Sequence, residues 1–193
     1  MADEGGYLEP EVRGMLDAGC WHPDKFSYLN LRIKLFYYMS ENAIQDYYPD
    51  DVAHCYGCGR LNEHGYQLKT YWDDGETVAE FTPQPYHTAI PGYVYGGLIA
   101  SLIDCHGTGT AAAAAARAEE RVLEEAGAPR FVTASLKVDY LRPTPLGPVL
   151  KLRGTVKELK ERKVVVSITL SAEGEVCARG EVVAVKMPAG MTG

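Results

Sequence analysis

The stretch from Pro91 to Ala116, PGYVYGGLIASLIDCHGTGTAAAAAA, constrains the fold more than any other part of the chain. From Gly96 onward it contains no proline and no cluster of turn residues, and its apolar side chains recur at helical spacing. The sequence therefore predicts a long, largely buried helix. Along one side of it, the positions that repeat every three or four residues are small, apart from Asp104. Small side chains allow another element to approach the helix closely.

Asp104 lies midway along this apolar helix. Burying a carboxylate costs free energy unless the group is paired or used in chemistry. Two interpretations therefore stay open: a carboxylate that is hydrogen-bonded to nearby backbone or hydroxyl groups, or a catalytic group. We take Asp104 as the first candidate for a catalytic residue.

The length and charge of the chain limit the classes of function. Its 193 residues are enough for one domain with a full core and an additional segment. Nineteen basic against 26 acidic residues, a net charge of −7, argue against a nucleic-acid surface but not against a small anionic ligand. The apolar runs are too short to span a bilayer, and the acidic start, MADEGGYLEPE, does not resemble a secretory signal. We expect a cytoplasmic protein with no membrane or nucleic-acid partner.

The cysteines suggest reduced thiols, because they are five in number and irregularly spaced. Cys55 and Cys58 form a CxxC in the glycine-rich loop HCYGCGRLNEHG, between His54 and His64. A zinc site needs four ligands, and a second pair at the usual separation is missing. A thioredoxin-type motif would open a helix after a strand, which this one does not. The sequence therefore favours a folded loop with buried thiols, and we predict no metal site.

The remaining patterns predict an α+β domain with a helical extension at residues 1–50, where apolar residues between Phe26 and Phe36 follow helical steps. A hairpin is expected over 66–82, turning at Asp73-Asp74-Gly75. We expect the long helix to continue to Gly127. After it, period-two patterns and turn signals predict strands at 132–140, 148–158, 163–172 and 175–187.

Short connections make these four strands antiparallel neighbours. One long helix is then the element available to cover the inner face of the sheet, so an antiparallel sheet wrapped around a single helix fits best. The small-residue stripe also leaves part of the helix and sheet ready for a second copy of the chain. We expect one domain over 51–187 and a loose tail at 188–193.

PGYVYGGLIASLID combines two glycines at a helix start with a carboxylate eight residues after the first of them. This arrangement resembles the P-G-x-x-H-G-G motif and carboxylate of hotdog-fold thioesterases of the phenylacetic-acid-pathway (PaaI-like) and 4-hydroxybenzoyl-CoA thioesterase group. CYGCG…N…HG before the first strand and VTASLKVDYLRPTPLG after the helix also resemble that group. The resemblance covers about residues 55–187. It implies a hotdog fold and an acyl-CoA thioesterase, and the chain departs from the motif at Tyr95, where histidine is common.

Thioester hydrolysis needs a group that stabilises the oxyanion and a base or nucleophile. The free N–H groups of Gly96 and Gly97, at the positive end of the helix dipole, suit the first role, and Asp104 suits the second. The hydroxyl of Tyr95 can still donate a hydrogen bond. At about 1.5 Å per residue, Gly96 and Asp104 are roughly 12 Å apart, so one subunit cannot supply both groups to one thioester. We predict sites shared between two subunits of a homodimer, or of a tetramer.

The resemblance implies that a hydroxyl on the strand after the helix assists the carboxylate. Thr133 occupies the matching position and Ser135 is the alternative, although either could be a solvent-facing strand residue. His87 lies in the loop before the helix and could reach the site. No cofactor is expected apart from coenzyme A as part of the substrate. Positive charge is expected near its phosphates, and the candidates, which could equally be ordinary surface residues, are Arg142, Arg162 and Lys163.

Two other functions stay open. A hotdog hydratase or dehydratase would use His87 and Asp104 for proton transfer. A non-catalytic acyl-CoA-binding dimer would fit the tyrosine at position 95 and the additional amino-terminal segment. A serine hydrolase lacks support, because no G-x-S-x-G occurs, and a cysteine nucleophile lacks support because Cys105 is predicted to face away from the small-residue stripe.

Overall fold

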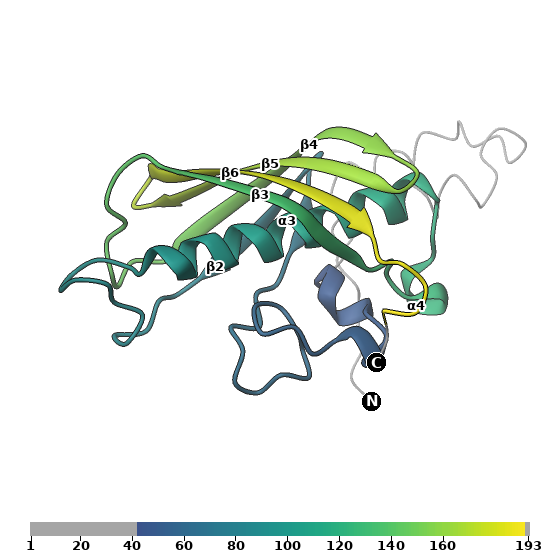
Figure 1. Ribbon diagram of the computed structural model, residues 1–193, viewed down its shortest axis with the longest axis horizontal. Coiled ribbons are helices and arrows are strands. Elements are labelled where there is room, and N and C mark those ends of the chain that lie inside the picture. Colours follow the sequence, from purple (N-terminus) through teal and green to yellow (C-terminus); the bar gives the residue numbers. More distant parts are fainter. Residues whose placement is uncertain (1–41, 192–193) are drawn as a thin grey trace, which may run out of the picture. The chain divides into compact units, whose positions relative to one another are not determined.

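The computed structural model describes residues 42–191, so the helix predicted between Phe26 and Phe36 lies outside the described residues. Figure 1 shows one long helix lying against a curved sheet. The elements are, in chain order, η2 (Ile44–Tyr47), η3 (Asp50–Val52), β1 (Tyr71–Asp73), β2 (Glu76–Phe81), α3 (Gly96–Ala118), α4 (Leu123–Ala126), β3 (Phe131–Tyr140), β4 (Leu150–Lys160), β5 (Lys163–Ala172) and β6 (Glu175–Lys186).

The six strands form one antiparallel sheet in the order β1-β2-β4-β5-β6-β3. Alternate residues of β5 are buried, as expected for a strand with one face on the core. Across from them α3 contributes Leu98, Leu102 and Ile103, each at most 1 % exposed. Burying one such side chain contributes roughly 1.5–3 kcal/mol. The predicted architecture, an antiparallel sheet wrapped around one long helix, is confirmed.

The predicted hairpin is also confirmed, because β1 and β2 pair on either side of the turn Asp74-Gly75. Both turn residues have positive φ, 40° at Asp74 and 91° at Gly75. Asp and Gly tolerate this left-handed conformation better than other residues, which is why a DG pair favours a tight hairpin.

The end of the long helix differs from the prediction. α3 ends at Ala118, and the short α4 ends just before Gly127 instead. At the break, Glu120 takes a left-handed conformation with φ of 49°, and the N–H of Arg121 donates to the carbonyl of Ala116. This hydrogen bond across the last turn closes the helix. Residues with high helical propensity continue beyond Ala118, but the helix ends there because of this local turn.

The glycines between α3 and the sheet explain how closely the two pack. A Cβ atom added at Gly107 would lie 2.5 Å from a methyl group of Val182 on β6. One added at Gly180 on β6 would lie 2.2 Å from Ile103. Part of the small-residue stripe therefore serves contact with the chain's own sheet.

The first described residues pack against this domain. Ala43, Ile44 and Tyr48 belong to the hydrophobic core, and the Ile44 N–H donates to the carbonyl of Thr70 at 3.0 Å. The buried Gln45 side chain binds both the N–H and the hydroxyl of Thr70. Residues 42–50 of the predicted extension thus take part in the same core as the sheet.

Strand β3 lies at one edge of the sheet and pairs only with β6 among the described strands. A β-bulge between Thr133 and Ser135 interrupts its alternation, and the apolar side chain of Leu136, just after the bulge, is 38 % exposed. Among residues 42–191, no helix combines the length and the apolar character needed to cross a membrane.

Candidate functional site

The first turn of α3 offers two unused backbone donors. Tyr95 is the N-cap residue, and its side chain makes no capping hydrogen bond. Within the described residues, the N–H groups of Gly96 and Gly97 have no hydrogen-bond acceptor. The turn is held by other contacts: the Tyr140 hydroxyl donates to the Gly96 carbonyl at 2.8 Å, and the Tyr95 N–H donates to the His87 carbonyl at 2.9 Å. These free donors at the positive end of a long helix suit a developing negative charge.

Tyr95 places its side chain over the same turn. A Cβ atom added at Gly97 would lie 2.5 Å from the Tyr95 hydroxyl oxygen and 2.4 Å from its ring. The hydroxyl that replaces the more common histidine therefore lies beside the helix start, where it can donate a hydrogen bond to a ligand.

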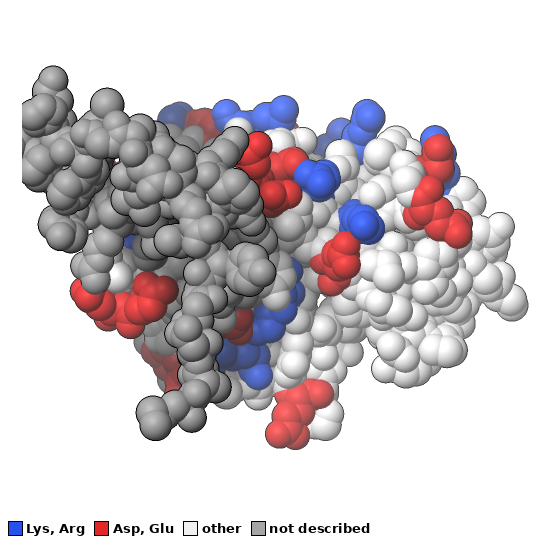
Figure 2. All heavy atoms as spheres, turned by 180° about the vertical axis from the view of Figure 1, so that it is seen from behind, with Lys and Arg blue, Asp and Glu red and all other residues white. Residues whose placement is uncertain are grey.

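A hollow of about 360 Å³ opens beside this turn. On the face shown in Figure 2, most of the surface toward the end where α3 begins is uncharged. Several apolar side chains near the start of α3 are exposed, including Ile90, Tyr93 and Leu141. An apolar hollow next to unused N–H donors suits a ligand with an apolar chain and a carbonyl. The hollow is lined by Tyr93, Val94, Gly96, Ile99, Tyr140, Leu141, Arg142, Pro143 and Thr144.

Asp104 lies two turns further along α3 and is half-buried. The Thr133 hydroxyl on β3 donates a hydrogen bond to its Oδ1 atom, and Oδ2 accepts none from the described residues. Burial raises the pKa of Asp104 above its usual value, while the hydrogen bond from Thr133 opposes that shift. The carboxylate is thus held in place through one oxygen and leaves the other available.

The bulge on β3 distinguishes the two candidate hydroxyls. Thr133 lies immediately before it and contacts Asp104. Ser135 lies immediately after it and is exposed. Bulges commonly re-aim a side chain at a site, and here the hydroxyl that reaches the carboxylate belongs to Thr133.

His87 packs in an aromatic group beside the helix start. Its ring centroid lies 4.6–5.6 Å from those of Tyr66, Phe81 and Tyr86. Its Nδ1 atom accepts a hydrogen bond from the Gln84 N–H at 3.0 Å, and burial lowers the pKa of the imidazole. Among the described residues, His87 therefore contacts this aromatic group and the backbone of Gln84, and not Asp104.

The three candidate phosphate-binding residues do not lie together in one chain. Arg142 lines the hollow beside Gly96 and forms an ion pair with Glu175. Arg162 lies in the turn between β4 and β5, and Lys163 is the first residue of β5. Both lie near the other end of α3, because the Arg162 carbonyl accepts a hydrogen bond from the Lys186 N–H, and the Lys186 ammonium pairs with Glu119.

Two residues from Asp104, the side chain of His106 is completely buried. Its Nδ1 and Nε2 atoms lie 3.1 and 3.3 Å from the hydroxyls of Thr70 and Thr77. Burial lowers the pKa of His106 to about 4, so the ring is neutral at pH 7. Both ring nitrogens are satisfied, and His106 is a structural residue of the core.

A third cysteine joins the CxxC, which the spacing in the sequence did not reveal. Cys105 on α3 lies 3.8 Å from Cys55, sulfur to sulfur. The pKa of Cys55 is lowered by hydrogen bonds with the side chains of Cys105 and Cys58. The pKa of Cys105 is raised, chiefly by its hydrogen bond with Cys55. The only signal in the sequence was that Cys105 is expected to face away from the small-residue stripe of the helix.

Comparisons with known proteins agree on the family. The model of the Thioesterase superfamily matches residues 91–183. A crystal structure of a Thioesterase superfamily protein from Shewanella loihica is 59 % identical, with 66 % of this chain and 96 % of that chain covered and a TM-score of 0.54. A phenylacetic acid degradation-related protein from Ralstonia eutropha, 19 % identical with 62 % and 85 % covered and a TM-score of 0.51, shares the fold.

Two curated relatives are more distant. The Acyl-coenzyme A thioesterase THEM4 of Xenopus laevis is 31 % identical over 58 % of this chain and 45 % of its own length. That of Mus musculus is 30 % identical over 58 % of this chain and 43 % of its own length. The chain therefore spans somewhat less than half the length of these relatives.

Proposed function

Because this chain belongs to the thioesterase superfamily, we propose that it hydrolyses the thioester of an acyl-coenzyme A. The observation that carries the proposal is the arrangement on α3, where unused N–H donors at Gly96 and Gly97 precede the half-buried carboxylate of Asp104. The curated relatives that the chain matches over part of their length are named acyl-coenzyme A thioesterases, which supports the substrate class.

In the proposed reaction, the thioester carbonyl oxygen accepts hydrogen bonds from the first turn of α3. Negative charge builds up on this oxygen when water or a carboxylate adds to the carbon, and the helix dipole and the N–H groups stabilise it. The Tyr95 hydroxyl can add a further donor at the same place. If water has added, collapse of the tetrahedral species expels the coenzyme A thiolate and leaves the carboxylic acid. If the Asp104 carboxylate has added, collapse expels the thiolate and leaves a mixed anhydride, which water then hydrolyses to the carboxylic acid and the free Asp104.

Asp104 delivers the oxygen atom, either by taking a proton from water or by attacking the carbon itself. Thr133 acts as a positioning residue, because its hydroxyl holds Oδ1 and leaves Oδ2 free to face the substrate. Holding a carboxylate in one orientation lowers the entropic cost of reaching the reactive geometry.

We propose that the two halves of each site come from different subunits. Gly96 and Asp104 lie on one unbroken helix, so eight residues separate them by about 12 Å. Two features support a second copy of the chain: β3 is an edge strand with exposed apolar side chains, and apolar residues surround the helix start. A homodimer with two shared sites would bring Gly96 of one subunit near Asp104 of the other and would cover these apolar surfaces.

The test is a panel of acyl-coenzyme A substrates with free thiol as the readout, combined with measurement of the oligomeric state. Thiol release that is lost in Asp104→Asn, with the fold and the oligomer retained, supports the proposal. Binding of acyl-coenzyme A without turnover contradicts it and indicates a binding protein. Hydration of an enoyl-coenzyme A that is lost in His87→Ala contradicts it and indicates a hydratase.

A further inference from the structure

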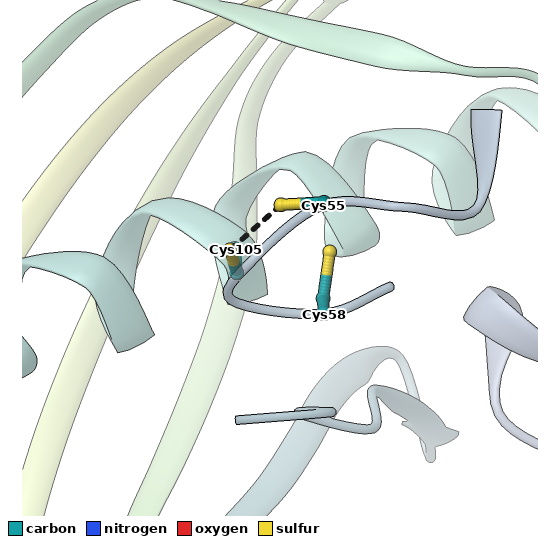
Figure 3. A group of neighbouring side chains, drawn as sticks. All are labelled: Cys55, Cys58 and Cys105. Carbon is teal, nitrogen blue, oxygen red and sulfur yellow. Dashed lines mark hydrogen bonds between the residues drawn. The ribbon is translucent and has the colours of Figure 1, made fainter. Parts of the chain in front are cut away.

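Three cysteine side chains converge beneath α3, outside the proposed catalytic groups. Cys55 and Cys58 come from the loop before β1, and Cys105 comes from the helix (Figure 3). Their sulfur atoms all lie within 4.8 Å of one another. Cys58 and Cys105 are 1 % and 4 % exposed, whereas Cys55 is half-buried and gives the group one side toward solvent.

The sulfur spacing suits a bound metal ion better than a disulfide. Zinc–thiolate bonds are about 2.3 Å long, so two sulfurs at corners of a tetrahedron around zinc are about 3.8 Å apart. The Cys55–Cys105 distance is 3.8 Å. A disulfide would need this pair to close to about 2.0 Å.

The loop is shaped to bring its two cysteines to the helix. A Cβ atom added at Gly57, between them, would lie 2.3 Å from the Cys105 sulfur. One added at Gly59 would lie 2.4 Å from the Cys55 backbone nitrogen. A side chain at position 57 would push the loop away from α3, and one at position 59 would clash with the backbone of the loop itself. The two glycines therefore allow all three sulfurs to meet.

Charge balance favours a divalent ion. Three thiolates and one divalent cation carry a net charge of −1. Arg130, whose charge acts on Cys55 and Cys58, is half-buried and stacks on the Tyr48 ring at 4.8 Å. Its Nη1 atom is buried and donates no hydrogen bond within residues 42–191. One guanidinium beside the cluster therefore neutralises the charge that a divalent ion would leave.

We propose that Cys55, Cys58 and Cys105 bind a thiophilic divalent cation of the zinc class. Three protein ligands leave a fourth position for water or another small ligand, on the half-exposed side of Cys55. The bound ion fastens the CxxC loop to α3 beside Asp104. This inference is independent of the proposed function, since it makes no demand on catalysis.

The test uses the reduced, metal-free full chain titrated with Co²⁺, a spectroscopic substitute for Zn²⁺. We expect one Co²⁺ per chain with a thiolate-to-cobalt charge-transfer band, displaced by one equivalent of Zn²⁺. Cys55→Ser and Cys105→Ser should each weaken binding by more than about 100-fold. Cys177→Ser is the matched control, because Cys177 on β6 is also buried and free but lies outside the cluster, and it should bind like the wild type.

A further variant keeps the test valid if the cysteine variants fail to fold. Arg130→Gln keeps all three sulfurs and should weaken Zn²⁺ binding by about tenfold or more, as loss of outer-shell support commonly does. Thermal unfolding without metal checks that each variant is folded. The proposal is overturned if the reduced wild type shows no cobalt–thiolate band, or if Cys105→Ser binds Co²⁺ as tightly as the wild type.

Discussion

Asp104 and His106 lie two residues apart on α3 and occupy opposite environments. Asp104 is half-buried; its Oδ1 atom accepts a hydrogen bond from Thr133, and its Oδ2 atom accepts none from the described residues. His106 is fully buried, with both ring nitrogens next to threonine hydroxyls. At about 100° per residue, the two side chains point to different sides of the helix. A buried polar group with every partner supplied stabilises the fold, whereas one with an atom left open is available for chemistry.

The largest expected effect comes from Asp104→Asn. The amide keeps the size of the carboxylate and can still accept the hydrogen bond from Thr133, but it cannot act as base or nucleophile. We expect kcat/KM for acyl-coenzyme A hydrolysis to fall by about 10³-fold, equivalent to roughly 4 kcal/mol of barrier, with the melting temperature nearly unchanged. Steady-state thiol release and thermal unfolding measure the two quantities. A variant that keeps more than about a tenth of the activity would remove Asp104 from the mechanism.

Acidification should lower the stability of the fold through His106. Its pKa is about 4 in the folded protein and 6.5 in its ordinary state, so the unfolded chain binds the proton first as the pH falls. The free energy of unfolding linked to His106 is therefore fully present above about pH 6.5 and declines by roughly 3 kcal/mol as the pH falls toward 4. Denaturant unfolding at several pH values measures the slope. In His106→Gln the slope across this window should be smaller than in the wild type, and an equal slope would assign the acid sensitivity elsewhere.

Thr133→Val sharpens the comparison, since it removes one hydroxyl while keeping the branched shape. Hydrogen bonds to charged groups contribute about 1.5–3 kcal/mol, so we expect kcat to fall by about tenfold or more and KM to change little. Thr133→Ser should restore most of the rate. Ser135→Ala on the same strand is the matched control and should behave like the wild type. The opposite pattern, with loss in Ser135→Ala alone, would assign the role to Ser135.

Tyr140→Phe should have the smallest effect. It removes the hydrogen bond to the Gly96 carbonyl, which is made at the protein surface. We expect a loss of about 0.5–1 kcal/mol in the free energy of unfolding and a change in kcat/KM of about twofold. Chemical denaturation and steady-state kinetics provide the measurements. A much larger loss of activity would show that the helix start depends on Tyr140 for its geometry.

Much of the fold was predictable because its signals are local. The helical spacing from Gly96, the alternation in β5 and the Asp-Gly turn each lie within a short stretch of chain, and the structure contains all three elements. Where the prediction was wrong, a local signal was overruled. Helical propensity continued past Ala118, but the left-handed Glu120 and the closing hydrogen bond of Arg121 ended the helix.

For the candidate site too, some features could be predicted from the sequence and others depend on the tertiary structure. The separation of Gly96 from Asp104 follows from helix geometry and could be read directly from the chain. The contact of Asp104 with Thr133, rather than Ser135, depends on a bulge that arises only when β3 pairs with β6.

The sequence by itself determined the long glycine-led helix, the antiparallel strands and the position of the one carboxylate, because each depends on residues that are neighbours along the chain. Only the tertiary structure decided that Cys105 meets Cys55 and Cys58 and that His106 is enclosed by threonines. These contacts join residues far apart in sequence, and no periodicity records which distant side chains a folded core will bring together.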